Sequence, residues 1–520
     1  MKKLDHILLV LFMISFSSCN EDILDIENEQ SYNAETFFTN AETFNQGVIG
    51  IYSTLYHQAG YARELPLFID FMGIDAEPNS ALSGDGRELA DYTFNANSPF
   101  VNQLWRLYYR MMLRSNLILS EIEDWEPIAS NDVNLKNQFI GEASFFRAYA
   151  IFSLIQYFGR APIHLTYLSH IENPQPSRAT FEQMWATVES DLETAIQNLP
   201  LEYDDVNEGR ITRGAAVAQL GKAHLYQQDW LSAITQFETL TQSPYNYSLE
   251  NDLDNLFIET AAQTSDETIF EVKHGEVTGN FFYMFGGQET WGGATTHNGK
   301  NMEFGGLNWN NGHVEPVLIN THLYQDDTGS PYIDPRAFKN YYADSAKSVV
   351  NGGDTDYCNT CESVRAWTSS QVSYRKYMLY ESTPPEGMRP QSSINHQVIR
   401  YADVLLMLAE AYIETNRIGD ALPLINRVRA RSGAFEYATL GDATQATEKL
   451  RRERRIEFFS EQLHYHDMRR WDTFENEIGP IVQARLGNNP VRPRHRYLPI
   501  PQSEIDTNPN IEYFDFPGWN

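Results

Sequence analysis

Residues 220–237 read LGKAHLYQQDWLSAITQF, and this stretch has the pattern of a helical hairpin. Ala233 lies twelve residues after Gly221, and Phe237 follows four residues later. Small residues at these positions let two antiparallel helices approach closely, while large residues fill the remaining space. The spacing therefore predicts two packed helices of the tetratricopeptide type.

The same offsets recur in residues 408–428, which read LAEAYIETNRIGDALPLINRV. Here Ala409 precedes Ala421 by twelve residues, and Tyr412, Ile425 and Val428 occupy the large positions. A third hairpin is expected from residues 145–158 and 181–199, separated by a long insertion. The first of these two segments is apolar nearly all round, which predicts a helix buried on all sides.

Helical periodicity extends outward from these hairpins over residues 34–158, 180–242 and 398–474. Between residues 245 and 396 the composition changes, and Gly, Asn, Asp, Thr and aromatic residues become frequent. This composition indicates loops with a few short strands. We therefore expect an all-α protein whose helical repeats, about 34–242 and 398–474, carry a loop-rich ligand face at about 245–396. Residues 19–520 are expected to form a single domain.

The first 18 residues have the form of a secretory signal. Lys2 and Lys3 precede an apolar run from Ile7 to Phe16, which is too short to span a membrane. The run ends at Ser17-Ser18-Cys19, and small residues before a cysteine resemble the lipobox of bacterial lipoproteins. Cys19 is therefore the predicted lipidation site. The alternative is ordinary signal cleavage beside an incidental cysteine.

The two remaining cysteines, Cys358 and Cys361, lie in a polar loop with C-x-x-C spacing. Because an exported protein meets oxidising conditions, a disulfide is the preferred interpretation. A zinc site would need two further ligands, and a redox centre would need a strand and a helix around it. Asp354 and Asp356 nearby are either solvated or ligands of a calcium ion. We expect no metal and no cofactor.

The 520 residues carry a formal net charge of -31, and aromatic residues make up 13% of them. A surface this acidic repels nucleic-acid phosphates and anionic lipid headgroups, so both are excluded as main partners. An anionic polymer would need a local basic patch, and the loops show none. The composition therefore favours a neutral ligand, and the aromatic surplus fits a core, an interface or a sugar-stacking surface.

Five segments in order resemble the SusD/RagB family over nearly the whole mature chain. Residues 141–162 carry GEASFFRA and then YFGRAP, similar to the family's G-E-A-x-F-x-R-A and Y-x-G-x-x-P. The other four are RYADVLL with AEA at 400–411, NRVRAR at 426–431, ERRIE with DMRRW at 453–471, and YLPIP with NPN at 497–510. The sequence departs from the family at Asp403, where Glu is usual, and at His464-Tyr465-His466.

This resemblance implies tetratricopeptide-like hairpins, a loop-rich face and attachment to the outer membrane at the cell surface. It implies that the protein binds oligo- or polysaccharide without chemistry and delivers it to a SusC-like, TonB-dependent barrel. The RagB branch binds peptides instead, so a peptide-binding import lipoprotein is the alternative. Tetratricopeptide hairpins also bind proteins, and that role would be additional.

The sequence nominates no catalytic site. His464 and His466 are two residues apart, which on a helix turns them to different sides. Neither H-E-x-x-H nor G-x-S-x-G occurs. In residues 451–457 like charges share a helix face, so we expect a buried network of this segment with Asp467, Arg469, Arg470 and Arg429. The protein is therefore expected not to be an enzyme.

Ligand contacts are expected where aromatic residues lie on polar, glycine-containing loops, because sugar rings stack on flat side chains. Each such residue could instead pack onto the core. Trp291 and Trp309 are the first choices and Tyr283 is the third, followed by Phe282 and Trp367. Asp75 and Asn79 are added because the family often places hydrogen-bonding contacts in that region.

Overall fold

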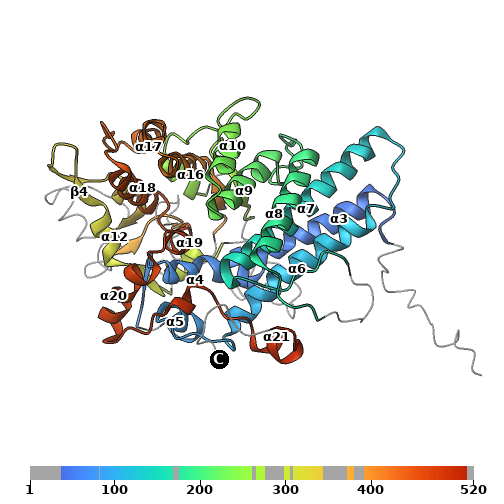
Figure 1. Ribbon diagram of the computed structural model, residues 1–520, viewed down its shortest axis with the longest axis horizontal. Helices are drawn as coiled ribbons and strands as arrows, with labels where there is room; N and C mark the ends of the chain where they lie inside the picture. Colours follow the sequence, from blue (N-terminus) through green and yellow to red (C-terminus); the bar gives the residue numbers. More distant parts are fainter. Residues whose placement is uncertain are drawn as a thin grey trace, which may run out of the picture.

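The computed structural model describes residues 37–80, 82–167, 175–259, 265–275, 298–304, 309–342, 372–379 and 392–511. Most of this part is helical, which confirms the expected all-α fold with a few short strands (Figure 1). The first helices are α3 (Ala41–Tyr52), α4 (Glu64–Met72), α5 (Gly84–Ala90), α6 (Pro99–Glu121), α7 (Ser130–Phe158), α8 (Phe181–Asn198), α9 (Arg213–Tyr226) and α10 (Trp230–Leu240). Short helical turns η2 (Ser53–Tyr56) and η3 (Gln58–Ala62) connect α3 to α4.

The C-terminal part of the chain is helical again. Its elements are α16 (Tyr401–Glu414), α17 (Ile418–Arg431), α18 (Ala443–Glu457), α19 (His464–Arg470), α20 (Phe474–Leu486), η6 (Pro493–Arg496) and α21 (Gln502–Thr507). Side-chain caps fix several helix starts, because Asn40, Thr180 and Asp442 each accept from the backbone of the first turn and form a capping box. Among the described residues, no helix has both the length and the apolar character needed to cross a membrane.

The predicted hairpins are present. Helix α9 packs against α10, α16 against α17, and α7 against α8. A β-carbon added at Gly221 would lie 2.5 Å from Phe237 Cε1, which shows why a glycine is needed where α9 and α10 cross. Residues 148–158 of α7 are all buried, as the apolar pattern predicts. A single continuous apolar core runs through these hairpins and includes Phe44, Leu220, Leu406 and Ile500.

Between α10 and α16 the described elements are short. They are η4 (Leu253–Phe257), β2 (Thr268–Val272), α11 (Lys300–Phe304), β3 (Gly312–Val314), α12 (Pro316–Thr321), β4 (Leu323–Gln325), β5 (Pro331–Ile333), α13 (Ala337–Asn340), β6 (Tyr341–Tyr342), β7 (Ser373–Tyr374) and β8 (His396–Arg400). With β1 (Ala76–Pro78), the strands form four antiparallel pairs, β1 with β3, β2 with β8, β4 with β5 and β6 with β7.

Three buried cations fasten this segment to the helical scaffold. Lys300 Nζ lies 3.1 Å from Asp70 Oδ2 of α4, Arg336 Nη1 lies 3.0 Å from Glu457 Oε2, and Lys376 Nζ lies 2.9 Å from Glu461 Oε1. All three cations are at most 3% exposed. Because breaking a buried pair leaves an uncompensated charge, these contacts fix the position of the segment.

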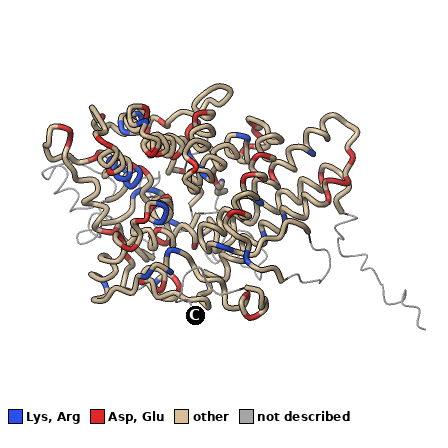
Figure 2. The backbone as a smooth tube through the Cα atoms, viewed as in Figure 1, with Lys and Arg blue, Asp and Glu red and all other residues tan. Residues whose placement is uncertain are grey.

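A buried ionic network surrounds α18, as the sequence predicts. Arg454 bonds Asp467 and Asp403, each at 2.8 Å, and Arg470 bonds Asp467 at 2.7 Å. Arg429 joins through Glu453 at 2.8 Å. Arg469 differs from the prediction, because it donates to the backbone carbonyl of Gln156. Figure 2 shows Lys and Arg gathered around α17, α18 and α19.

Candidate functional site

Trp309 stands out on the surface between α11 and β3. It is 39% exposed, and among the described residues it is the one tryptophan that is more than a third exposed. Its backbone N–H donates to the carbonyl of Met302 in α11 at 3.1 Å. The backbone at Trp309 is therefore bonded to α11, while the residue remains partly accessible to a ligand.

A fixed guanidinium lies over this indole. Arg63 Cζ is 5.5 Å from the centre of the Trp309 ring, within the range of a cation–π interaction. Arg63 Nε donates to Glu303 Oε1 at 2.5 Å, and Asn311 Nδ2 donates to Glu303 Oε2 at the same distance. Because Glu303 is fully buried, both of its partners are positioned by the core.

Asn79 belongs to the same surface. Its backbone N–H donates to Asn311 O at 2.9 Å, and its side-chain amide donates to Asn310 O at 3.0 Å. The β1–β3 pair sets this register, with Pro78 opposite Gly312. Asn310 adopts a left-handed backbone conformation at φ 50°, which turns the chain between Trp309 and β3. The structure thus brings two predicted residues, Trp309 and Asn79, to one place.

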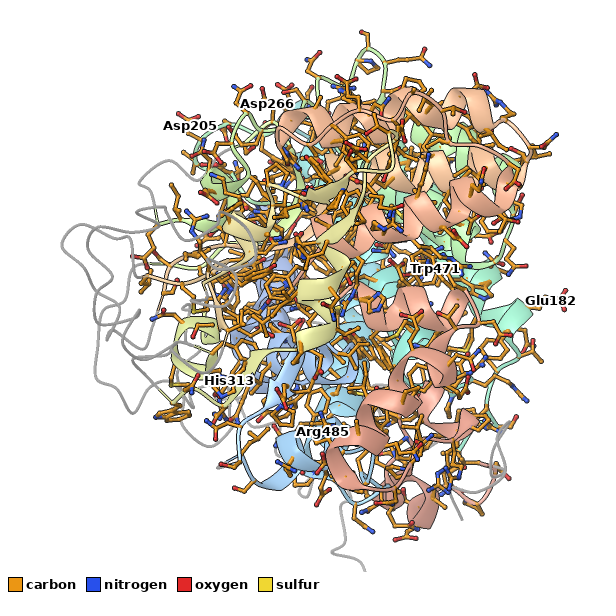
Figure 3. The ribbon with its side chains drawn as sticks, turned by 90° about the vertical axis from the view of Figure 1, so that its left-hand side faces the viewer. Glu182, Asp205, Asp266, His313, Trp471 and Arg485 are labelled. Carbon is orange, nitrogen blue, oxygen red and sulfur yellow. The ribbon has the colours of Figure 1, made fainter. Side chains whose placement is uncertain are left out.

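Strand β3 continues from this surface to His313, and Glu315 follows the end of the strand; both residues are buried. Figure 3 labels His313 on the face formed by the left-hand end of Figure 1, where Arg485 of α20 is also labelled. Burial lowers the pKa of His313, and burial together with Glu77 raises the pKa of Glu315 to about 7. His313 is therefore neutral at neutral pH, whereas a Glu315 carboxyl group with this pKa is only partly ionised there.

Asp75 does not fit the role predicted for it. The side chain is 1% exposed, one of its oxygens pairs with Arg455 of α18, and the other accepts from the backbone N–H of Ser460 at 3.0 Å. A carboxylate whose two oxygens serve interior partners is not available to a ligand. Asp75 is therefore explained as a structural residue that ties β1 to α18.

The other predicted site residues lie outside the described residues. They are Phe282, Tyr283, Trp291 and Trp367 among the ligand contacts, Cys19 as the lipidation site, and Cys358 and Cys361 as the disulfide. Three residues that now belong to the site, Arg63, Glu303 and Asn311, were missed. Only Arg63 had a recognisable signal in the sequence, because it is the one Lys or Arg in residues 58–72.

The described residues show neither a metal cluster nor a catalytic arrangement. No group of three or more His, Cys, Asp or Glu side chains in this part could hold a metal ion. His464 pairs with Glu477 at 3.2 Å and His466 lies 3.3 Å from the Tyr157 hydroxyl, so the two histidines face different partners. Stacking and hydrogen bonding are what the Trp309 surface offers chemically.

A pocket of about 70 Å³ lies elsewhere, between α7, α9 and β8. Its lining includes Tyr61, Tyr149, Gln219, Lys222 and His396. An engineered cavity of about 150 Å³ binds one benzene molecule, so half that volume suits a few water molecules better than a sugar ring. The exposed Trp309 surface is therefore the better candidate for ligand binding.

Two family models match the chain. One is described as the SusD family and matches residues 337–519, and the other is described as starch-binding associating with outer membrane and matches residues 22–225. SusD-like protein P25 from Formosa agariphila is 26% identical, and the match covers 98% of this chain and 97% of that protein. SusD-like protein P2 from the same organism is 22% identical over 98% of both chains.

Solved structures share the fold over most of its length. A SusD superfamily protein from Bacteroides vulgatus superposes with a TM-score of 0.75 at 26% identity, covering 92% of this chain and 99% of that one. A structure described as a laminarin binding SusD-like protein superposes with a TM-score of 0.71 at 23% identity, and the match covers 92% of this chain and 100% of that one. Surface glycan-binding protein A from Bacteroides fluxus superposes with a TM-score of 0.70 at 18% identity, and the match covers 90% of this chain and 97% of that one.

Proposed function

The chain belongs to the SusD family, and on this basis we propose that it binds oligo- or polysaccharide at the cell surface without cleaving it. We further propose that it delivers this ligand to a SusC-like, TonB-dependent transporter in the outer membrane. One matching family model is described as starch-binding and associated with the outer membrane, which supports both the ligand class and the location. Two structural relatives, one described as laminarin-binding and one as a surface glycan-binding protein, support the same ligand class.

The observation that carries the proposal is the exposed indole of Trp309 on a rigid base. The flat C–H face of a sugar ring stacks on such a ring, in the way that aromatic side chains bind other flat apolar surfaces. Asn79 lies on the same surface with its side-chain amide bonded to the Asn310 carbonyl, and the buried Glu303 holds Arg63 in place. A site assembled before the ligand arrives loses little entropy on binding.

Attachment to the membrane is proposed to occur through a lipid on Cys19, after removal of residues 1–18. One acyl chain holds a protein weakly, but several chains on one cysteine hold it firmly. The mature chain from Cys19 to Asn520 would then work as one unit at the outer surface. Trp291, Tyr283, Phe282 and Trp367 remain proposed ligand contacts, and Cys358 with Cys361 remains a proposed disulfide.

The test uses the soluble form of residues 20–520 on a glycan array, followed by affinity electrophoresis in gels that contain the best glycan. Trp309→Ala should abolish retardation of the protein by that glycan, whereas Trp309→Phe should retain part of it because a flat ring remains. Leu231→Ala is the matched control, since Leu231 is a 71% exposed apolar residue on α10. Equal mobility of wild type and Trp309→Ala would reject this site.

The same material separates the alternatives. Peptide libraries should give no binding, and incubation with the bound polysaccharide should release no reducing ends. Tight binding of peptides together with an empty glycan array would favour the peptide-binding branch. Release of reducing ends at an ordinary enzymatic rate would overturn the proposal that the protein is not an enzyme.

A further inference from the structure

Helix α11 is the element to which the chain around Trp309 is bonded. The carbonyl of Met302 accepts from the backbone N–H of Trp309 at 3.1 Å, and the carbonyl of Glu303 accepts from the backbone N–H of Asn311 at 2.7 Å. The helix is itself fixed to α4, because its first residue, Lys300, is buried and paired there. The turn that carries the indole therefore takes its position from α11.

The Glu303 carboxylate binds this surface from below with both oxygens. Oε1 accepts from Arg63 Nε and Oε2 accepts from Asn311 Nδ2, each at 2.5 Å. An ionised carboxylate is suited to this place because it accepts at both oxygens and has nothing to donate. Since Glu303 is fully buried, it affects a ligand only through these two partners.

Arg63 connects the buried carboxylate to the exposed ring. Its Nε–H bond to Glu303 restricts how the planar guanidinium can turn, and its Cζ lies 5.5 Å from the centre of the Trp309 ring. Cation–π attraction requires the cation to lie over the face of the ring. A guanidinium held in one place therefore favours one orientation of the indole.

We propose that Glu303 is the positioning residue of the ligand site. It acts through Arg63, which orients the Trp309 ring, and through Asn311, which holds the turn after that ring, and it does not touch the ligand. Side chains that are ordered beforehand lose less entropy when a ligand binds, so the carboxylate raises affinity. This inference rests on the proposed function and assigns a role in affinity to a residue of the core.

The test substitution is Glu303→Gln. Glutamine has nearly the same shape, but its amide N–H2 group would face one of two donors, Arg63 or Asn311, so at least one contact must break. Affinity per folded molecule of residues 20–520 is measured by affinity electrophoresis with laminarin, starch and the polysaccharide that wild type binds best on the array. Arg63→Met and the double variant Arg63→Met/Glu303→Gln complete the set, and Arg63→Met alone tests the same contact if Glu303→Gln does not fold.

A matched control separates positioning of the site from general stability. Glu142 of α7 is also fully buried, and its Oε1 accepts from Arg210 at 3.0 Å and from Gln138 at 2.6 Å. Glu142→Gln therefore creates a similar conflict between donors in another part of the core. It should lower the midpoint of urea unfolding and leave polysaccharide affinity per folded molecule unchanged.

We expect Glu303→Gln and Arg63→Met each to weaken binding by about tenfold, the effect of losing one positioned contact. The double variant should bind no more weakly than the weaker single variant, because both substitutions break the same contact. Affinity of Glu303→Gln equal to wild type overturns the inference, as does an equal loss in Glu142→Gln or additive losses in the double variant. If Trp309→Ala alone abolishes binding, the proposed function stands without this inference. Failure of wild type to bind any of the polysaccharides rejects the proposed function itself.

Discussion

Glu64 is a single carboxylate through which the stability of the fold depends on pH. Its Oε1 accepts from Gln58 at 2.6 Å, and the side chain is nearly buried at the start of α4. Burial raises its pKa to about 7, although Arg63 and Gln58 oppose the shift. Since the folded state holds this proton more tightly than the unfolded state, folding stability contributed by Glu64 falls as pH rises from about 4.5 to about 7.

Glu64→Gln should remove this pH dependence, because glutamine has the same shape and no charge. The difference in free energy of unfolding between pH 5 and pH 8 should change by about 2 kcal/mol relative to wild type, in favour of the variant at pH 8. Urea titrations at the two pH values measure it. Glu42→Gln, at an exposed position of α3, should give a profile parallel to wild type. A parallel profile for Glu64→Gln would contradict the prediction.

The Asp75–Arg455 pair is a second test at this scale. Arg455→Met should leave the Asp75 carboxylate buried without its cation, which destabilises a protein by about 3–5 kcal/mol. Urea unfolding measures this loss, while glycan affinity per folded molecule should stay unchanged because Asp75 is interior. The double variant Asp75→Asn/Arg455→Met should recover much of the stability. A fully stable Arg455→Met protein that no longer binds glycan would restore Asp75 as a ligand contact.

Among the elements, the α9–α10 hairpin depends on one glycine. Gly221→Ala would place a methyl group 2.5 Å from Phe237, and such overpacking typically costs about 1–3 kcal/mol. Gly419→Ala in α17 is the matched control, because a β-carbon there would meet nothing within 4 Å. We expect the control to gain up to about 1 kcal/mol from higher helix propensity. Thermal unfolding of both variants measures the difference in stability, and equal melting temperatures would contradict the predicted role of Gly221.

The elements also show what sequence reasoning could predict. The twelve-residue offset from Gly221 to Ala233 is local information, so the hairpins were predicted correctly. The network around Arg454 and Asp467 was predicted because like charges on one helix face need partners elsewhere. The prediction that Asp75 contacts ligand was wrong. Asp75 is buried because α18 and the residues after it approach β1, and no local sequence pattern encodes that approach.

The candidate site was predicted only in part, because some of its contacts join residues far apart in the sequence. Trp309 has polar neighbours that indicate exposure, so it was selected from the sequence itself, whereas Asn79 was selected from where the SusD/RagB family often places hydrogen-bonding contacts. Arg63 and Glu303 are 240 residues apart, and only the folded chain brings them together.

For the whole molecule, the decisive prediction concerns its attachment. Cys19→Ala should move the protein from the membrane fraction to the soluble fraction, because the substitution removes the thiol that would carry the proposed lipid. Radiolabelled palmitate should enter the wild type and not the variant. Cys358→Ser is the control and should stay with the membrane. Labelling that persists in Cys19→Ala would place the lipid on another residue.

The buried cations Lys300, Arg336 and Lys376 have a consequence for how such proteins diversify. Each cation is paired with a carboxylate outside this segment, and the described residues between them make further contacts with the helices, such as the 2.9 Å bond from Asn340 Nδ2 to the Ile456 carbonyl. Substitutions between these three positions could therefore change which ligand such a protein binds without breaking the ion pairs to the helices. Among related sequences, loss of the cation at position 300, 336 or 376 should be far rarer than substitutions at the positions between them.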